Sequence, residues 1–248
     1  MSDYLVFRLY APLASWGTAA VGEERPTATY PGRAAIVGLL AAALGIRRHE
    51  SQRLTELNAN LAIAVKQYCA GRLLRDYHTV QTPPTRRGRH FYTRRDELNR
   101  PANELSTIIS RRDYRSDGLW IVAIQATAAA PADLLRDLAA ALENPRFTLY
   151  LGRRACPPAA PLAPQCIRVD NWRAALDHEF PPLADAWGNP LIRARDVLYS
   201  WEESAAALDG NTSGVESSEV WDVPGDRDRW QFAQRREFRR YARAEGDR

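Results

Sequence analysis

Residues 4–10 read Y-L-V-F-R-L-Y, an apolar run of aromatic and branched side chains that stops at Pro12. This composition predicts a buried strand. A loop rich in glycine, proline and threonine follows as far as Pro31, and residues 33–44 then carry isoleucine and leucine at helical spacing before Gly45. Glycine in that place is a common helix stop. The chain therefore begins as a strand, a long loop and a helix.

The next segments read as two strands and an insert. Residues 61–68 alternate as a strand does, and Gly71 marks a tight turn into residues 72–77, so we expect a hairpin here. The pattern is lost over residues 80–103, where prolines and Gly88 interrupt a strongly basic stretch. We expect this insert to project from the fold.

Regular patterns resume at residues 107–110. Residues 119–127 predict a strongly apolar strand, residues 132–142 an amphipathic helix after Pro131, and residues 146–151 a further apolar strand. The order approximates β-α-β-β-α-β, the ferredoxin-like arrangement. Such a sheet has one face covered by two helices and leaves the other face available, and in RNA-recognition modules that open face binds single-stranded RNA.

The C-terminal third has a different composition. Beyond Cys156 the chain is rich in proline and then acidic, with a predicted strand over residues 191–201 and a low-complexity acidic loop over residues 203–219. Residues 231–241, Q-F-A-Q-R-R-E-F-R-R-Y, are compatible with a basic edge strand, a helix or a contact with a partner.

We therefore expect an α+β protein of two regions. Residues 1–155 form a ferredoxin-like, RRM-like domain whose insert at about 80–105 protrudes as a basic thumb. Residues 156–248 form a smaller β-rich region with an acidic loop at about 202–222. A chain of 248 residues with 45% apolar composition is long enough for such a core.

Composition also excludes several classes of protein. The longest uncharged apolar run, residues 34–44, is shorter than the roughly 20 residues that span a membrane. The cysteines number 3 and form no C-x-x-C pair, which argues against a disulfide framework and a cysteine-rich zinc site. We expect a soluble protein of the cytoplasm that needs no metal and no cofactor.

Charge is segregated along the chain. All basic residues except Lys66 are arginine, a bias that a GC-rich genome also produces. Residues 176–226 hold eleven acidic residues against two arginines, a local net charge of −9, so the remainder carries +13. Residues 75–115 and 227–248 are both basic. Basic segments of this kind suit a polyanion such as RNA.

No strong enzyme motif is present. The sequence has no G-x-G, no Gly-Lys dipeptide for a phosphate loop, and neither H-E-x-x-H nor G-x-S-x-G. The histidines, at positions 49, 78, 90 and 178, are too scattered to predict a metal site. We therefore predict a protein that is not an enzyme and has no catalytic residues.

Some local features point to RNA contact. In L-R-D-Y-H-T-V, residues 74–80, Tyr77 and His78 suit stacking on bases, although His78 also suits proton transfer with Asp76 fixing its tautomer. A plain strand end explains these polar side chains equally well. The insert over residues 86–100 interleaves arginines with aromatic residues, the composition of a single-strand contact or of a solvated loop.

Two further strings carry glycine, arginine and tryptophan. In Y-L-G-R-R-A-C-P, Gly152 allows another backbone to approach closely, and the guanidinium groups of Arg153 and Arg154 can grip phosphate; a solvated turn is the alternative. In P-L-A-S-W-G, Trp16 is either a stacking platform or a core residue.

Taken in order, these strings resemble the CasD subunit family of the type I-E CRISPR surveillance complex, Cascade. The resemblance runs from about Tyr4 to Tyr241 and rests on R-L-Y-A-P-L-A-S-W-G, E-R-P-T, P-G-R-A-A-I-V-G-L-L-A-A-A-L-G-I, L-R-D-Y-H-T-V, I-S-R-R-D-Y, Y-L-G-R-R-A-C-P and Q-F-A-Q-R-R-E-F. The acidic stretch over residues 202–222 departs from the family's pattern.

The resemblance implies a repeat-associated ferredoxin-like fold with a thumb, and an RNA-binding subunit that holds the repeat-derived 5′ handle of the guide RNA and caps one end of the backbone. Its partners would be that RNA, the backbone subunit and the large subunit, and target DNA only through the assembled complex. The implied RNA-binding positions are Trp16, Arg25, Arg33, Tyr77, His78, Arg86, Arg87, Arg89, Arg111, Tyr114, Arg153, Arg154 and Cys156.

Two other functions stay open. His78 beside Tyr77 and Asp76 is compatible with a metal-independent endoribonuclease that processes repeat RNA, although one neutral histidine seldom covers both proton transfers. Arginines that pair with acidic partners would instead indicate a protein-interaction module.

Overall fold

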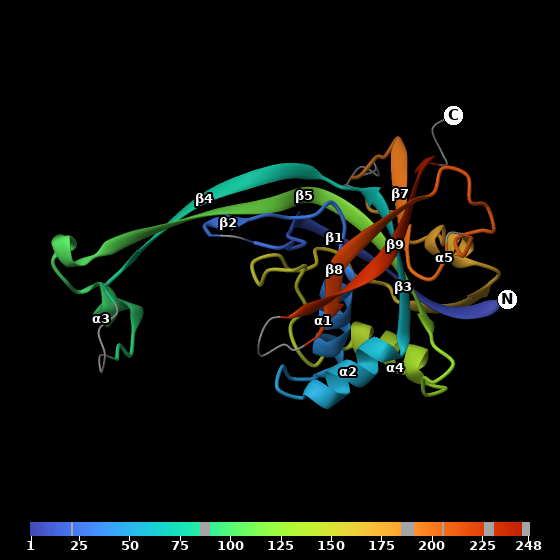
Figure 1. Cartoon of the computed structure of the whole chain (residues 1–248), viewed down its shortest axis with the longest axis horizontal. Helices are drawn as coiled ribbons and strands as arrows, with labels where there is room; N and C mark the ends of the chain where they lie inside the picture. Colours follow the sequence, from blue (N-terminus) through green and yellow to red (C-terminus); the bar gives the residue numbers. More distant parts are fainter. Residues whose placement is uncertain (21, 85–89, 185–190, 205, 226–230, 245–248) are drawn as a thin grey trace.

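The computed structural model describes residues 1–20, 22–84, 90–184, 191–204, 206–225 and 231–244. Its strands are β1 (Ser2–Ala14), β2 (Glu24–Arg25), β3 (Leu61–Cys69), β4 (Arg72–Thr82), β5 (Ser106–Ala126), β6 (Gln165–Val169), β7 (Asp196–Trp201), β8 (Glu216–Pro224) and β9 (Phe232–Arg243). Its helices are α1 (Arg33–Leu44), α2 (Ser51–Ala59), α3 (Arg94–Leu98), α4 (Leu134–Glu143), α5 (Trp172–Leu176) and the 3-10 turn η1 (Ala102–Glu104). Figure 1 shows their arrangement.

The strands form one mainly antiparallel sheet in the order β6-β1-β5-β3-β7-β9-β8, with β2 and β4 also paired to β5. The prediction of an α+β chain is confirmed. Residue 155 does not divide this sheet, since β6 pairs with β1 and β7 pairs with β3. Strands of the C-terminal region therefore extend the sheet on both flanks of the N-terminal strands.

The first strand is buried on both faces. Leu5, Phe7 and Leu9 pack into the core on the side of α1 and α4, while Tyr4 and Val6 pack on the opposite side. A strand covered on both faces reads as a continuous apolar run, which explains the sequence of β1. Helix α1 has the predicted bounds and ends at Gly45, whose φ of +74° is the left-handed conformation that glycine adopts most readily.

The predicted hairpin between residues 61–68 and 72–77 is wrong. Strands β3 and β4 both pair with β5, so the chain continues in one direction through Gly71 instead of reversing there. A Cβ on Gly71 would lie 2.1 Å from the carbonyl oxygen of Ser116, so glycine lets the two backbones meet at this kink. The hairpin is instead formed by β4 and β5.

That hairpin is a long arm. Strands β4 and β5 pair from Arg72 with Ser116 to Thr82 with Ser106, and they extend away from the rest of the molecule with α3 near the far end (Figure 1). The prediction of a projecting insert is confirmed in the described part of the chain, although the arm begins earlier than expected. Among the described residues, no helix has the length and apolar character needed to cross a bilayer.

The predicted strand over residues 146–151 is also wrong. Arg146 and Phe147 donate their main-chain N–H groups to the carbonyls of Ala43 and Ala42, so this segment caps the C-terminus of α1. Leu149 and Leu151 are buried, and their alternation with polar residues reflects core packing without a sheet ladder. The strand next to β1 is β6.

The expectation of an open sheet face is wrong as well. Trp172 and Leu176 of α5 form a second hydrophobic cluster with Val6 of β1 and Ala123 of β5. This cluster lies on the face of the sheet opposite α1 and α4, so the short helix α5 covers part of the second face. The sheet face is therefore not bare as it is in an RNA-recognition module.

The C-terminal predictions are partly right. Strand β7 occupies the end of the predicted strand at residues 191–201, and the stretch expected as an acidic loop contains the start of β8. Strand β9 lies between β7 and β8, so the basic segment at residues 231–241 is an internal strand and not an edge.

Candidate nucleic-acid interface at the base of the arm

A surface of rings and arginines lies where the arm leaves the sheet. Tyr77 of β4 is 58% exposed and is the register partner of Arg111 of β5. The Arg111 guanidinium donates to the carboxylate of Glu24 at 2.6 Å, and this hydrogen bond raises the pKa of Arg111. An exposed ring beside a guanidinium is a surface on which a nucleic-acid base can stack.

Gly152 brings a tight turn against the base of the arm, on the face of β5 opposite Arg111. Its φ is +83°, and a Cβ would lie 1.7 Å from the carbonyl oxygen of Ser15, so the close backbone approach requires glycine. The N–H of Cys156 closes the turn by donating to the carbonyl of Arg153 at 2.8 Å. The prediction that Gly152 allows a close approach is confirmed.

The turn positions Arg153 over an aromatic ring. The guanidinium carbon of Arg153 lies 4.5 Å from the centre of the Tyr114 ring. Its Nη1 donates to the carbonyl of Asp113 at 3.1 Å, and its Nη2 donates to the carbonyl of Arg25 at 2.9 Å. A guanidinium has five N–H donors, so these bonds fix its orientation and leave donors for an anionic ligand.

Among the described residues, no carboxylate forms an ion pair with the neighbouring Arg25 or Arg154. Arg25 is exposed and donates to the main-chain carbonyls of Gly22 and Glu24 at 2.6 and 2.8 Å. Arg154 is exposed on the same turn as Arg153. This grouping produces a positive surface suited to phosphate.

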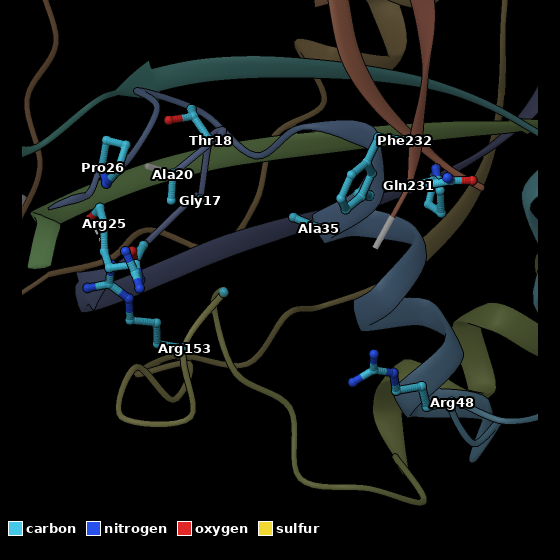
Figure 2. A pocket seen from close by; sticks show the side chains of 14 residues that line it. Gly17, Thr18, Ala20, Arg25, Pro26, Ala35, Arg48, Arg153, Gln231 and Phe232 are labelled. Carbon is cyan, nitrogen blue, oxygen red and sulfur yellow. Dashed lines mark hydrogen bonds between the residues drawn. The ribbon is translucent and has the colours of Figure 1, made fainter. Parts of the chain in front are cut away.

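A cavity of about 420 Å³ opens beside these residues. Figure 2 shows Arg25 and Arg153 near one another on one side of it and Phe232 on the other, with Arg48 at a further corner. Its floor includes Ala35 from the first turns of α1. The cavity thus combines guanidinium groups with an aromatic wall, which is the chemistry that holds a nucleotide.

Two of the candidate residues, Trp16 and Cys156, belong to the core. Trp16 is 3% exposed and packs edge-on against Trp120 with ring centres 5.1 Å apart. Of the two alternatives for this residue, the structure therefore shows the core residue and not the exposed stacking platform. Cys156 is buried, and burial raises the pKa of its thiol. Both residues support the site from behind.

The RNA-binding interpretation of Arg33 needs correction. This residue is 8% exposed, and its guanidinium donates to Glu202, to the side chain of Asn58 and to the carbonyl of Leu61. With its donors occupied by buried acceptors, Arg33 stabilises the contact between α1 and the C-terminal strands. With a further bond to the carbonyl of Asn58, four of its five N–H donors have partners within the fold, which favours a structural role for this buried side chain.

The two rings of L-R-D-Y-H-T-V point to different faces of the arm. Successive side chains of a strand alternate, so His78 lies on the face of β4 opposite Tyr77. The Nδ1 atom of His78 is 3.7 Å from a carboxylate oxygen of Asp76, which is too long for a hydrogen bond. The structure therefore does not bring Tyr77 and His78 onto one surface.

The outer part of the arm is described in part. Arg86, Arg87 and Arg89, the predicted thumb contacts, lie outside the described residues. In the described part of the outer arm, the guanidinium of Arg100 lies 5.3 Å from the centre of the Phe91 ring.

Sequence reasoning missed two contributors to the cavity. Arg48 follows α1, and Phe232 begins β9, so both come from segments other than those of Arg25 and Arg153. The string that begins Q-F-A-Q holds Phe232, but an aromatic residue among arginines does not reveal which distant surface it joins.

Comparison with known proteins identifies the family of this chain. Residues 4–237 match the family described as CRISPR-associated protein (Cas_Cas5). The chain is 34% identical over 209 residues to the CRISPR system Cascade subunit CasD of Escherichia coli (strain K12), which covers 81% of this chain and 87% of the relative.

Solved structures give the same result. A chain of a CRISPR RNA-guided surveillance complex matches with a TM-score of 0.63 and 26% identity over 97% of this chain and 90% of that one. A Cas protein crystal structure matches with a TM-score of 0.60 and 28% identity over 97% and 94%. The chain belongs to the CRISPR-associated Cas5 family, and the resemblance to CasD is confirmed.

Proposed function

We propose that this chain is a non-catalytic RNA-binding subunit of a type I-E Cascade complex in the cytoplasm, where it holds the repeat-derived 5′ handle of the guide RNA. In this role it caps one end of the backbone and contacts the backbone and large subunits. Target DNA meets it only through the assembled complex, because sequence recognition belongs to pairing with the guide.

The observation that carries the proposal is the convergence at the base of the arm. Arg25, Arg153 and Phe232 come from three distant segments and line one cavity, and the Tyr114 ring lies under Arg153. On the other face of β5, Tyr77 adds an exposed ring beside Arg111, which is paired with Glu24. Guanidinium groups bind phosphates of any sequence, while rings stack on unpaired bases. The relatives named above, a Cascade subunit and a chain of an RNA-guided complex, support the choice of RNA.

The proposed fold refines the α+β architecture. We propose that β1, β3, β5 and β6, with α1 and α4 between them, are a ferredoxin-like unit in the order β-α-β-β-α-β. In an RNA-recognition module the ligand would cross the sheet face, which α5 covers here. The proposed RNA path therefore runs along the base of the arm.

A salt titration with fluorescein-labelled handle RNA tests the proposal. With roughly six phosphate contacts, a plot of log affinity against log salt has an expected slope near −4, from roughly −0.7 per contact on single strands. Arg153→Ala is expected to weaken binding by about tenfold or more. Arg136→Ala on α4 is the matched control, because Arg136 is equally charged, exposed and remote from the site. An affinity that does not change with salt, or an equal loss of affinity in the two variants, would refute the proposal.

The non-catalytic part of the proposal has its own test. Purified protein incubated with unprocessed repeat RNA in EDTA is expected to leave the RNA intact. Cleavage that disappears in His78→Ala would instead establish a metal-independent nuclease.

A further inference from the structure

One wall of the cavity comes from the far end of the chain. Pro224, Gln231 and Phe232 belong to the β8–β9 pair, whereas the other walls come from the loop after β1, from α1 and from the Gly152 turn. Strand β8 ends the sheet and pairs with β9 alone among the described strands. The sheet ladder therefore does not fix the distance between this wall and α1.

A polar contact fixes it instead. Asp222 Oδ2 accepts the main-chain N–H of Arg33 at 2.7 Å, at the first turn of α1, where the N-cap residue Gly32 has no side chain to do so. Asp222 thus caps α1 from another strand, and its negative charge lies at the positive end of the helix dipole. A shift in register between Trp221 and Val223 leaves Asp222 outside the β8–β9 ladder.

The same carboxylate binds Arg235 of β9. Arg235 donates to the two oxygens of Asp222 at 2.6 and 2.8 Å and to Glu237 at 2.8 Å. Burial alone lowers the pKa of Arg235, but these hydrogen bonds and the nearby carboxylates raise it above the ordinary value. We call Asp222, Arg235 and the main-chain N–H of Arg33 the latch.

The latch lies directly behind the cavity. Pro224, two residues after Asp222, and Ala34, next to Arg33, both line the cavity. The side chains of Asp222 and Arg235 do not line it. Any change in the latch therefore moves one wall relative to the other. Phe232, which is 40% exposed at the rim, moves with it.

We propose that Asp222 and Arg235 are positioning residues for the RNA site: they hold the β8–β9 pair against the N-terminus of α1 so that Phe232 completes the cavity opposite Arg153. This inference rests on the proposed function and adds to it a pair of residues that touch no RNA. The ligand at the cavity is one nucleotide of a single-stranded RNA, held by phosphate contact and stacking.

A switchable covalent replacement tests the positioning role. A Cβ built on Gly32 lies 3.5 Å from the Cβ of Asp222, which is within the range for a disulfide. Gly32→Cys combined with Asp222→Cys, in a Cys166→Ser background that removes the exposed thiol, exchanges the ionic latch for a bond that a reductant opens. Handle-RNA affinity is measured for oxidised and reduced protein at a temperature where circular dichroism shows both fully folded.

The oxidised variant is expected to bind within about threefold of the wild type, and the reduced variant about tenfold more weakly, with the same salt slope in both because no phosphate contact is removed. The Asp222→Ala variant should bind handle RNA weakly under both oxidising and reducing conditions. Glu219→Ala, an exposed neighbour on β8, should bind normally.

The outcomes separate the two proposals. If the wild type binds RNA and the double variant has one affinity in both redox states, the positioning role is wrong while the proposed function stands. If the wild type fails to bind handle RNA at all, the proposed function is wrong and the positioning role falls with it.

Discussion

Arginine has opposite roles at two places in this molecule. At the base of the arm, Arg25 and Arg153 donate to main-chain carbonyls and keep their charge for a ligand. At the junction of α1 with the C-terminal strands, the buried Arg33 and the partly buried Arg235 are paired with carboxylates. The role of each arginine is therefore set by the groups to which its guanidinium donates, and not by the residue type.

The comparison explains the acidic C-terminal segment. Glu202 pairs with Arg33, Asp222 with Arg235, and Asp209 with Arg240. Three acids of the stretch expected as an acidic loop therefore neutralise arginines within the fold. Part of the charge segregation along the sequence therefore becomes charge pairing in space, whereas Arg25 and Arg153 at the cavity donate to main-chain carbonyls.

The largest expected effect separates the two groups of arginines. Arg235→Ala leaves Asp222 and Glu237 without their buried partner, so we expect the free energy of unfolding to fall by about 3–5 kcal/mol. Arg25→Ala, at an exposed site, should change it by less than about 0.5 kcal/mol. Urea denaturation measures both, and similar values for the two variants would contradict the division.

A pair of glycines tests whether the Gly152 turn is fixed by close packing. Gly152→Ala forces a Cβ onto the Ser15 carbonyl, and we expect a loss of about 3 kcal/mol together with weaker RNA binding. Gly210 has nearly the same φ, +82°, but no atom within 4 Å of an added Cβ, so Gly210→Ala should cost only about 1 kcal/mol. Equal losses of stability for the two variants in thermal melts would show that the positive φ alone, and not close packing, sets the cost of the substitution.

An aromatic substitution sharpens the binding side of the comparison. Tyr77→Ala should weaken handle-RNA binding by about 1–3 kcal/mol through loss of stacking. Stability should stay nearly unchanged, because the ring is 58% exposed. Fluorescence anisotropy gives the affinity, with Tyr241→Ala as the control, since Tyr241 is 66% exposed on β9. A loss shared by the control would argue against a specific stacking site.

The smallest effect concerns pH. The hydrogen bond from Arg240 lowers the pKa of Asp209 to about 2, below its ordinary value of 3.8. A carboxyl group whose pKa is lower in the folded state stabilises the fold above about pH 4 and loses that contribution as the pH falls toward 2. We expect about 1–2 kcal/mol. Asp209→Asn should reduce this acid dependence in urea melts, and an unchanged dependence would refute the assignment.

Local features of the fold were predictable from the sequence, whereas the pairing of distant segments was not. The apolar run of β1 and the helical spacing before Gly45 depend on neighbours in sequence, and both predictions hold. The hairpin at Gly71 failed because the sequence cannot show that β3 and β4 share β5. The covering of the second sheet face was missed because α5, at five residues, is too short to produce a helical pattern.

The same limit applies to the site. Gly152 could be recognised because a glycine directly before two arginines has a local meaning, while Arg33 looked no different from Arg25. Only the fold shows that Glu202, far along the chain, reaches Arg33. Arg48 and Phe232 became visible as cavity residues for the same reason.

Photo-crosslinking of the full chain to handle RNA containing 4-thiouridine, with the modified peptides identified by mass spectrometry, tests the central claim most directly. We expect crosslinks at Tyr77 and Tyr114 and on the turn at residues 152–154, with little signal from α5. Crosslinks concentrated on α5 and residues 177–183, on the covered face of the sheet, would contradict an RNA site at the base of the arm.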